Sequence, residues 1–405
     1  MLSENSDEII RKVGVPFEVT KIGVRDPQKV RPVNGDLITT DLQSIIDDPE
    51  IEVILELMGG EDTAADCIES ALRKGKHVVT ANKELIAKQG SRLITLAQEV
   101  GKDLHFEAAV GGGIPIVQPL KHQLAGNDIV KMMGILNGTT NFILTKMHQE
   151  NADFSEVLQE AQDLGYAEAD PTSDVEGFDT KYKIGILAAI AFGRQVPLEN
   201  IHTEGITKIS DRDMHYAGVF GYRIKLLGIC EEIEPDKILV RVHPTLVPKD
   251  HPVSKVEDVY NALWIHGDFV GDLMFTGRGA GSDPTASAVV GDLIDCGRDM
   301  MAKGTGSAIP FGVGMQCASI SDLNTRYFIR LIVTDKPNTL GQIASTFGDS
   351  GVGLAAMEMR TLEADQGEIA FLTHECKESD FVSALKNVEG LEVVNSVENW
   401  LRVED

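Results

Sequence analysis

The sequence predicts an α/β protein with a parallel sheet near its N-terminus, a mixed sheet in its middle and a ferredoxin-like C-terminal unit. Between residues 16 and 110, short apolar strands alternate with amphipathic helices, the pattern of right-handed crossovers in a parallel sheet. The stretch 51–59 is almost entirely apolar, as expected for a strand that helices cover on both faces. Residues 327–405 show the βαββαβ order of a ferredoxin-like unit.

The individual elements follow from apolar patterning and from the turn residues between them. In the first region we expect strands at 16–24, 51–59, 77–82 and 103–110, and helices at 39–50, 62–75 and 83–101. In the second we expect a helix at 115–125, strands at 129–138, 236–247 and 267–277, and a helix at 285–301 that packs back on the first region. In the third we expect strands at 327–334, 354–361, 367–375 and 393–403 around helices at 338–351 and 377–390. A glycine-rich linker precedes the third region, so the chain divides into 1–112, 113–302, 303–326 and 327–405.

Composition excludes several classes of partner. The 405 residues carry a formal net charge of −26, and such an acidic surface repels nucleic acids and anionic membranes. No apolar run approaches the ~20 residues of a membrane span, and the N-terminus lacks a signal-peptide core. The five cysteines show no paired spacing, which favours reduced thiols over disulfides or a zinc site. We therefore expect a cytoplasmic globular protein.

Two loops follow strands of the predicted parallel sheet, where such sheets bind ligands. The "MGG" loop at 58–60 contains two glycines that allow a ligand to approach the backbone, and "TANK" at 80–83 places Lys83 at the same edge. Taken alone, an ordinary chain turn and a solvated lysine explain these short motifs better. The glycines at 111–113 expose backbone carbonyls near Glu107, which suits a hard cation, but an interdomain hinge explains them equally well.

A strand, an Asn-Gly turn and a helix follow one another in "LNGTTNFIL", residues 136–144, and we expect Thr139 or Thr140 to cap the helix. Its N-terminus could hold a carboxylate ligand, although a plain turn and cap needs no function.

Five carboxylates crowd the stretch 165–183 immediately before an apolar helix. Asp179 and Lys183 are four residues apart on one helical face and can pair. An exposed ion pair is the simplest explanation, but the apolar sequence that follows leaves little exposed surface here. A partly desolvated lysine can exchange protons near neutral pH, and Glu168 and Asp179 could hold the ammonium group of an amino acid. We favour this functional interpretation.

Together and in this order, the motifs "LMGG", "TANK", "FEAAVGGGIP", "LNGTTNFIL", "GYAEADPTSDVEGFDTKYK" and "GRGAGSDPTASAVVGDL" resemble homoserine dehydrogenases, from residue 1 to about residue 302. The segment "VTDKPNTLGQIASTF" resembles an ACT domain, an amino-acid-sensing module. The resemblance implies NAD- or NADP-dependent interconversion of L-homoserine and L-aspartate 4-semialdehyde in threonine, methionine and isoleucine biosynthesis. It further implies a homo-oligomer in which a Rossmann-like domain binds the nucleotide, 113–302 binds substrate and dimerises, and 327–405 regulates.

The resemblance also assigns roles to residues. Lys183 matches the catalytic lysine that exchanges a proton with the substrate oxygen, and Lys83 a second lysine facing substrate and nicotinamide. Other matched positions are Glu168, Asp179 and Asp174 for homoserine; Arg25, Met58, Gly59, Gly60, Thr80, Lys83, Gly165 and Gly281 for the cofactor; and Glu107, Val110, Gly112 and Ile114 for a monovalent cation, Na⁺. No Cys/His set for a zinc ion is evident, so a lysine must carry the proton.

One expected feature is missing. Members of the family begin with a strand and a glycine-rich turn that binds the pyrophosphate, whereas residues 1–14 resemble the end of the helix that follows such a turn. We therefore expect a truncation of about 20 residues and weak NAD(P) binding. Arg25 could meet a 2′-phosphate and favour NADP, although the adjacent Asp26 leaves NAD open.

Three hypotheses follow from the sequence. The leading one is an oligomeric homoserine dehydrogenase whose ACT domain binds threonine, or serves only for oligomerisation. The second is a catalytically impaired, amino-acid-binding regulatory protein. The third is another semialdehyde-linked dehydrogenase, which would not need the acidic cluster at 165–183.

Overall fold

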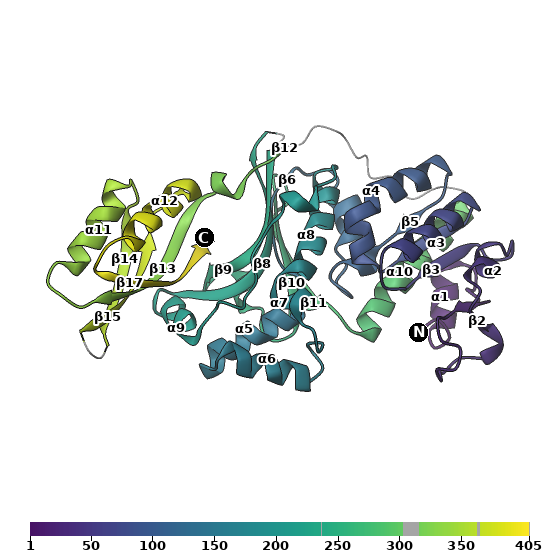
Figure 1. Cartoon of the computed structure of the whole chain (residues 1–405). Helices are drawn as coiled ribbons and strands as arrows, with labels where there is room; N and C mark the ends of the chain where they lie inside the picture. The colour runs from purple at the N-terminus through teal and green to yellow at the C-terminus, as the bar shows by residue number, and fades with distance from the viewer. Residues whose placement is uncertain (236, 303–315, 363–364, 405) are drawn as a thin grey trace. The chain divides into compact units, whose positions relative to one another are not determined.

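The computed structural model describes residues 1–235, 237–302, 316–362 and 365–404, and Figure 1 shows their helices and strands. The chain divides into two compact units. The first consists of Met1–Asp128, Gly185–Leu198 and Gly277–Val313, and the second of Ile129–Ile184, Glu199–Thr276 and Gly314–Asp405. The predicted linker at 303–326 lies partly outside the described residues, and its last three residues belong to a strand that begins at Asn324.

The first unit contains two small parallel sheets. Its elements are α1 (Ser6–Val13), β1 (Ile22–Gly23), β2 (Ile38–Thr39), α2 (Leu42–Ile46), β3 (Val53–Glu56), α3 (Asp62–Arg73), β4 (His77–Thr80), α4 (Lys83–Glu99), β5 (Leu104–His105), η2 (Glu107–Ala109), η3 (Pro119–Gln123) and α10 (Ser282–Ala302). Strands β3, β4 and β5 form one sheet, while β1 pairs only with β2 among the described strands. A parallel sheet is confirmed, but the strand predicted at 16–24 is two residues long and separate. The helix predicted at 115–125 is present in a shorter form at 117–123, which includes the π-helix η3.

Helix α10 packs on the β3–β4–β5 sheet of this unit, which confirms the prediction that this helix returns to the first region. Val289 and Cys296 of α10 form a buried apolar cluster with Val79 of β4, and Val53 and Leu55 of β3 pack against it. The neighbouring α1 lies against the same helix, since a Cβ at Gly297 would stand 3.1 Å from the Val13 side chain.

The second unit is built on a large mixed sheet with the order β11-β10-β6-β8-β9-β17-β13-β15-β14. Elements in its first part are β6 (Ile129–Ile135), α5 (Gly138–Glu150), α6 (Phe154–Asp163), α7 (Thr172–Val175), α8 (Phe178–Ala191), β7 (His202–Thr203), α9 (Asp211–Val219), β8 (Tyr222–Glu234), β9 (Lys237–Pro248), β10 (Tyr260–Gly267) and β11 (Gly271–Arg278). The sequence did not reveal β8 and β10. The strand predicted at 267–277 was also wrong at its start, because residues 268–270 turn between β10 and β11.

The C-terminal part of the second unit confirms the predicted ferredoxin-like order. Its elements are β12 (Gln316–Cys317), β13 (Asn324–Thr334), α11 (Thr339–Asp349), β14 (Leu354–Thr361), β15 (Gln366–Thr373), β16 (Cys376–Lys377), α12 (Glu378–Glu389) and β17 (Val394–Val403). Alternate residues of β13, from Tyr327 to Val333, pack in one core with Phe347 of α11 and Phe381 of α12. Asn338 before α11 has a φ of 72°, a left-handed conformation that asparagine tolerates well.

All five cysteines are free thiols. Among the helices in the described part of the chain, none combines the length and apolar character of a membrane span.

Lys225 on β8 makes the stability of the second unit depend on pH. The side chain is buried, and its Nζ donates to Asn141 Oδ1 (3.0 Å) and to the Val256 carbonyl oxygen (2.6 Å). Burial, with a smaller contribution from Arg223, lowers its pKa from 10.5 to about 8. Because the folded state binds fewer protons here than the unfolded state, the cost of the buried charge is present below pH 8 and is relieved as pH rises toward 10.5.

We therefore expect wild type to gain about 2–3 kcal/mol of unfolding free energy relative to Lys225→Met between pH 7 and pH 10. Methionine does not titrate. The loss of the two hydrogen bonds of Lys225 lowers the unfolding free energy of the variant by the same amount at both pH values. Urea unfolding of both proteins at the two pH values measures the difference. If the difference in unfolding free energy between the two proteins were the same at both pH values, Lys225 would not titrate in this range.

Candidate active site

Lys183 and Asp179 form a buried ion pair at the start of α8 in the second unit. Lys183 Nζ donates to Asp179 Oδ2 (2.7 Å) and to the backbone carbonyl oxygen of Leu136 (2.7 Å). Only 8% of Lys183 and 2% of Asp179 is exposed. The four-residue spacing places both side chains on one face of the helix, where Leu136 and Asn137, just after β6, bond to them. The predicted pairing is therefore confirmed, and it is a buried pair rather than a surface one.

Asn137 connects this ion pair to a second carboxylate. Its Nδ2 donates to Asp179 Oδ2 (2.9 Å) and to Asp174 Oδ1 (2.7 Å), while its Oδ1 accepts from the Thr140 N–H (2.9 Å). The prediction of Thr139 or Thr140 as the cap of α5 was wrong, because Asn137 is the cap. Asn137 was expected to be only a turn residue, although asparagine between the end of a strand and the start of a helix is itself a favoured cap and could have drawn attention to it.

The segment that carries Gly165 and Glu168 lies nearby in the same unit. Thr139 Oγ1 donates to the Tyr166 carbonyl oxygen (2.6 Å), which ties this segment to the start of α5. Gly165 has a φ of 74°, a left-handed conformation that favours glycine. Glu168 is exposed, and its backbone carbonyl accepts from Gln162 Nε2 (3.1 Å). Within the described residues, its carboxylate lies outside the hydrogen-bond network that joins Lys183, Asp179 and Asp174.

In the first unit, hydrogen bonds join the loops that follow β3 and β4. Thr80 Oγ1 donates to the buried Glu56 Oε2 (2.6 Å), and Glu56 Oε1 accepts from the Met58 N–H (2.6 Å). Asn82 Nδ2 donates to the Gly60 carbonyl oxygen (2.6 Å). Glu56 and Asn82 were not predicted; a carboxylate inside an apolar strand is the signal that could have revealed Glu56. This network fixes the two loops against each other at the carboxyl ends of their strands.

Lys83 and the two loop glycines lie at this same edge of the sheet. Asn82 caps α4 through a bond from the Leu85 N–H to its Oδ1 (3.1 Å), so Lys83 stands at the first position of the helix. A Cβ at Gly59 or Gly60 would meet no atom within 4 Å, which leaves open space for a ligand to approach the backbone. Arg25 follows β1 and is exposed. These positions fit a nucleotide at the carboxyl ends of the strands.

Close backbone approach explains two more of the predicted glycines. Gly112 has a φ of 56°, and a Cβ there would lie 2.5 Å from the Gly279 carbonyl oxygen, so this position requires glycine. Gly281, with a φ of 120°, lies directly before α10. The loop at 112 and the loop before α10 thus contact each other within the first unit.

The Glu107 carboxylate, predicted as a cation ligand, is buried beside that loop. Its oxygens accept from the backbone N–H groups of Ile116 (2.6 Å), Val117 (2.9 Å) and Gln118 (2.7 Å). Burial raises the pKa of Glu107, while these three N–H groups and the charge of Lys121 act in the opposite direction. A buried carboxylate beside a glycine-rich turn fits a hard monovalent cation.

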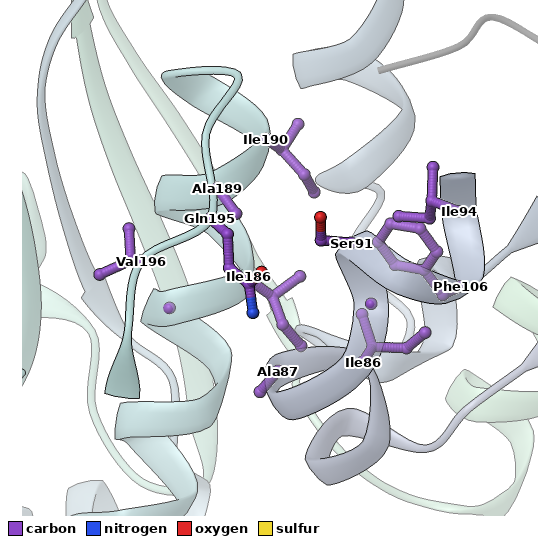
Figure 2. Close-up of a pocket in the computed structure, with 12 residues that line it drawn as sticks. Ile86, Ala87, Ser91, Ile94, Phe106, Ile186, Ala189, Ile190, Gln195 and Val196 are labelled. Carbon is purple, nitrogen blue, oxygen red and sulfur yellow. The ribbon is translucent and has the colours of Figure 1, made fainter. Parts of the chain in front are cut away.

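A separate apolar hollow lies within the first unit, between α4 and residues 185–191, the part of α8 that belongs to this unit (Figure 2). It encloses about 360 Å³ of space, part of it open to solvent, and Ile86, Ile94, Phe106 and Ile186 are among its walls. None of the predicted site residues lines it, so it does not belong to the candidate active site.

Comparisons with known proteins decide the family. A family model described as the NAD-binding domain of homoserine dehydrogenase matches residues 1–107, and a second, described as homoserine dehydrogenase, matches residues 115–294. The homoserine dehydrogenase of Bacillus subtilis is 42% identical over 100% of this chain and 94% of its own length. The chain belongs to the homoserine dehydrogenase family.

Solved structures agree with this family assignment. A homoserine dehydrogenase from Thiobacillus denitrificans matches with a TM-score of 0.94 and 41% identity, over 100% of this chain and 94% of that one. A hyperthermophilic archaeal homoserine dehydrogenase in complex with NADPH matches with a TM-score of 0.57 and 29% identity, over 66% of this chain and 76% of that one. The predicted family and Rossmann-like nucleotide-binding fold are confirmed, and the enzyme is an oxidoreductase that acts on a CH–OH group with NAD(P).

Proposed function

We propose that Lys183 exchanges the proton of the substrate's C4 oxygen when L-homoserine and L-aspartate 4-semialdehyde interconvert. The single observation that carries this role is the buried bonding of its Nζ to Asp179 and to the Leu136 carbonyl oxygen. Two acceptors hold the amine in one position and leave its third hydrogen-bond direction for the substrate. Lys83 is proposed to contact the same oxygen and to lie beside the nicotinamide. NAD(P), when bound, supplies the acceptor for the hydride that leaves C4.

The carboxylates of Asp174 and Asp179 support amino-acid binding beside Lys183. Asn137 donates to both of them, and Lys183 pairs with Asp179. Carboxylates gathered in a mostly buried cluster attract a further cation, because burial weakens the screening of their charge by water. The ammonium group of homoserine supplies that cation, and the exposed Glu168 adds a further carboxylate at the rim.

For the first unit we propose that Met58, Gly59, Gly60 and Thr80 form the nucleotide edge, together with Lys83. Thr80 acts indirectly in this proposal, because its hydroxyl holds Glu56 and the loop that contains Met58. Arg25 is placed to meet a 2′-phosphate, with Gly165 and Gly281 near the nicotinamide. Glu107 and the carbonyls of Val110, Gly112 and Ile114 would hold Na⁺, supported by the burial of the Glu107 carboxylate beside the glycine-rich turn.

We also propose threonine feedback through the ferredoxin-like segment, a homo-oligomer and a cytoplasmic location. The location is supported by the five free thiols.

Steady-state assays with L-homoserine and either NADP or NAD test the enzymatic proposal. Rates should require L-homoserine and should fall when millimolar threonine is added. If the oxidation rate with saturating homoserine equals the rate without it, the chain is not an active dehydrogenase. If threonine leaves the rate unchanged, only the regulatory proposal fails.

A further inference from the structure

Three potential metal ligands meet at the amino end of the β3–β4–β5 sheet, the edge opposite the proposed nucleotide loops. Asp103 immediately precedes β5, His105 is the last residue of β5, and Asp299 lies in the last turn of α10. One ligand atom from each of these three residues lies within 4.8 Å of the other two. All three belong to the first unit. None of them takes part in the proposed catalytic chemistry.

His105 supplies an independent indication of a ligand. Only 5% of the residue is exposed, and within the described part of the chain its Nε2 is buried without a hydrogen-bond partner. Its Nδ1, in contrast, lies 3.3 Å from Gln118 Nε2. A buried polar nitrogen without a partner is costly and uncommon in folded proteins, so this atom needs an explanation. A metal ion bound by Nε2 provides one.

The electrostatic surroundings favour a cation at this place. Asp103 is only 6% exposed, and its Oδ2 lies 2.9 Å from His77 Nδ1. The C-terminal end of α10 adds the negative end of a helix dipole. Two lysines add positive charge on this side. Lys102 Nζ lies 3.3 Å from His77 Nε2. The half-buried Lys121 interacts with the charges of Asp103, Asp292, Glu107 and Asp295, so carboxylates outnumber the lysines here.

We propose that Asp103, His105 and Asp299 bind a divalent transition-metal ion of the Zn²⁺ type that joins the start of β5 to the end of α10. One imidazole and two carboxylates suit Zn²⁺, Mn²⁺ or Co²⁺ better than Mg²⁺ or Ca²⁺, which prefer ligand sets made of oxygen alone. Bonds of about 2.0–2.2 Å require the three ligand atoms to approach each other more closely, which small side-chain rotations achieve.

The surroundings of His105 match this role. When Nε2 binds a metal, Nδ1 carries the proton and must donate it. A Gln118 amide rotated by half a turn presents its oxygen to Nδ1, and Asp292 Oδ1 lies 4.0 Å from the same nitrogen. Since the ion joins a strand to a helix away from the nucleotide loops, its expected role is to stabilise the first unit rather than to take part in the reaction.

Isothermal titration of the full, chelator-treated chain with Zn²⁺ tests the proposal. We expect one ion per chain, and a Tm that rises by about 5 °C or more at a hundredfold excess over Kd. Asp299→Asn should weaken binding about 100-fold or more while the protein stays folded, because this residue is half-buried at a helix end. His105→Gln, which keeps a polar amide but is a poor zinc ligand, should weaken it likewise.

Asp295→Asn is the matched control, since it removes the same charge one helical turn earlier on α10 from a residue that pairs with Arg298. This variant removes a nearby charge but no ligand, so it should weaken Zn²⁺ binding far less than Asp299→Asn does, and Mg²⁺ should not displace the ion. The proposal is overturned if wild type binds no Zn²⁺, or if Asp299→Asn and His105→Gln bind it as tightly as wild type. It is equally overturned if alkylation of the thiols abolishes binding, since the cysteines would then be the ligands.

Discussion

Lys183→Ala is expected to lower kcat for homoserine oxidation by about 10²–10⁴-fold, the usual contribution of a positioned acid–base group. The alanine removes the amine that bonds to Asp179 and to the Leu136 carbonyl oxygen. NADPH affinity should change little, because the proposed nucleotide loops do not include Lys183. Steady-state kinetics and a fluorescence titration with NADPH measure the two effects separately.

Two further variants separate proton transfer from charge. Lys183→Arg keeps a positive charge that pairs with Asp179 but does not release a proton in this pH range, so its kcat should stay near that of the alanine variant. Lys181→Ala, two residues earlier and therefore on a different face of α8, should retain nearly full activity. If Lys183→Arg were nearly as active as wild type, the amine would act through its charge alone and the proposed role would be wrong.

Asn137→Asp is expected to destabilise the second unit by about 3–5 kcal/mol at pH 8. The substitution replaces the amide that donates to Asp174 and Asp179 by a third carboxylate, while it keeps the oxygen that caps α5. Like charges at hydrogen-bond distance disfavour ionisation, so the destabilisation should shrink as pH falls toward 5 and one carboxyl takes up a proton. Urea unfolding at both pH values measures this, and kcat/KM for homoserine should fall about 100-fold with the disrupted cluster.

Asn137→Ser is the control for the cap. Serine also caps helices but is too short to reach both carboxylates, so it should cost about 1–3 kcal/mol at either pH. Equal stability of the aspartate and serine variants at pH 8 would mean that Asn137 does not hold the two carboxylates together.

Local sequence predicted one contact of the site, and tertiary structure determined the others. The Asp179–Lys183 pair follows from a four-residue spacing on a helix, which is visible without a fold. The bridge from Asn137 to Asp174 joins residues 37 positions apart and exists only because α7 packs against the start of α5. Glu56, Thr80 and Asn82 likewise depend on β3 and β4 being neighbours. The side-chain types identify these residues as candidates, but the sequence alone does not show which of them contact each other.

The same distinction holds for the fold. The ferredoxin-like order was predictable because each element of that segment shows its own periodicity and is bounded by turn residues. Strand β8 was missed since it is buried over most of its length and mixes apolar with charged residues, including the buried Lys225. The helix predicted at 115–125 is shorter in the structure, at 117–123, and Glu107 accepts from the N–H groups of Ile116 and Val117 at its start, a contact that the local sequence does not reveal.

A double-mutant cycle on Lys83 and Lys183 tests the central claim, that both amines act on one hydroxyl during NAD(P)-linked oxidation of homoserine. The measured quantity is kcat/KM for L-homoserine in wild type, Lys83→Ala, Lys183→Ala and the double variant. Residues that act as a unit are strongly non-additive, so the double variant should be little worse than the more impaired single variant. Multiplicative losses, or a wild type without homoserine-dependent turnover, would contradict the account.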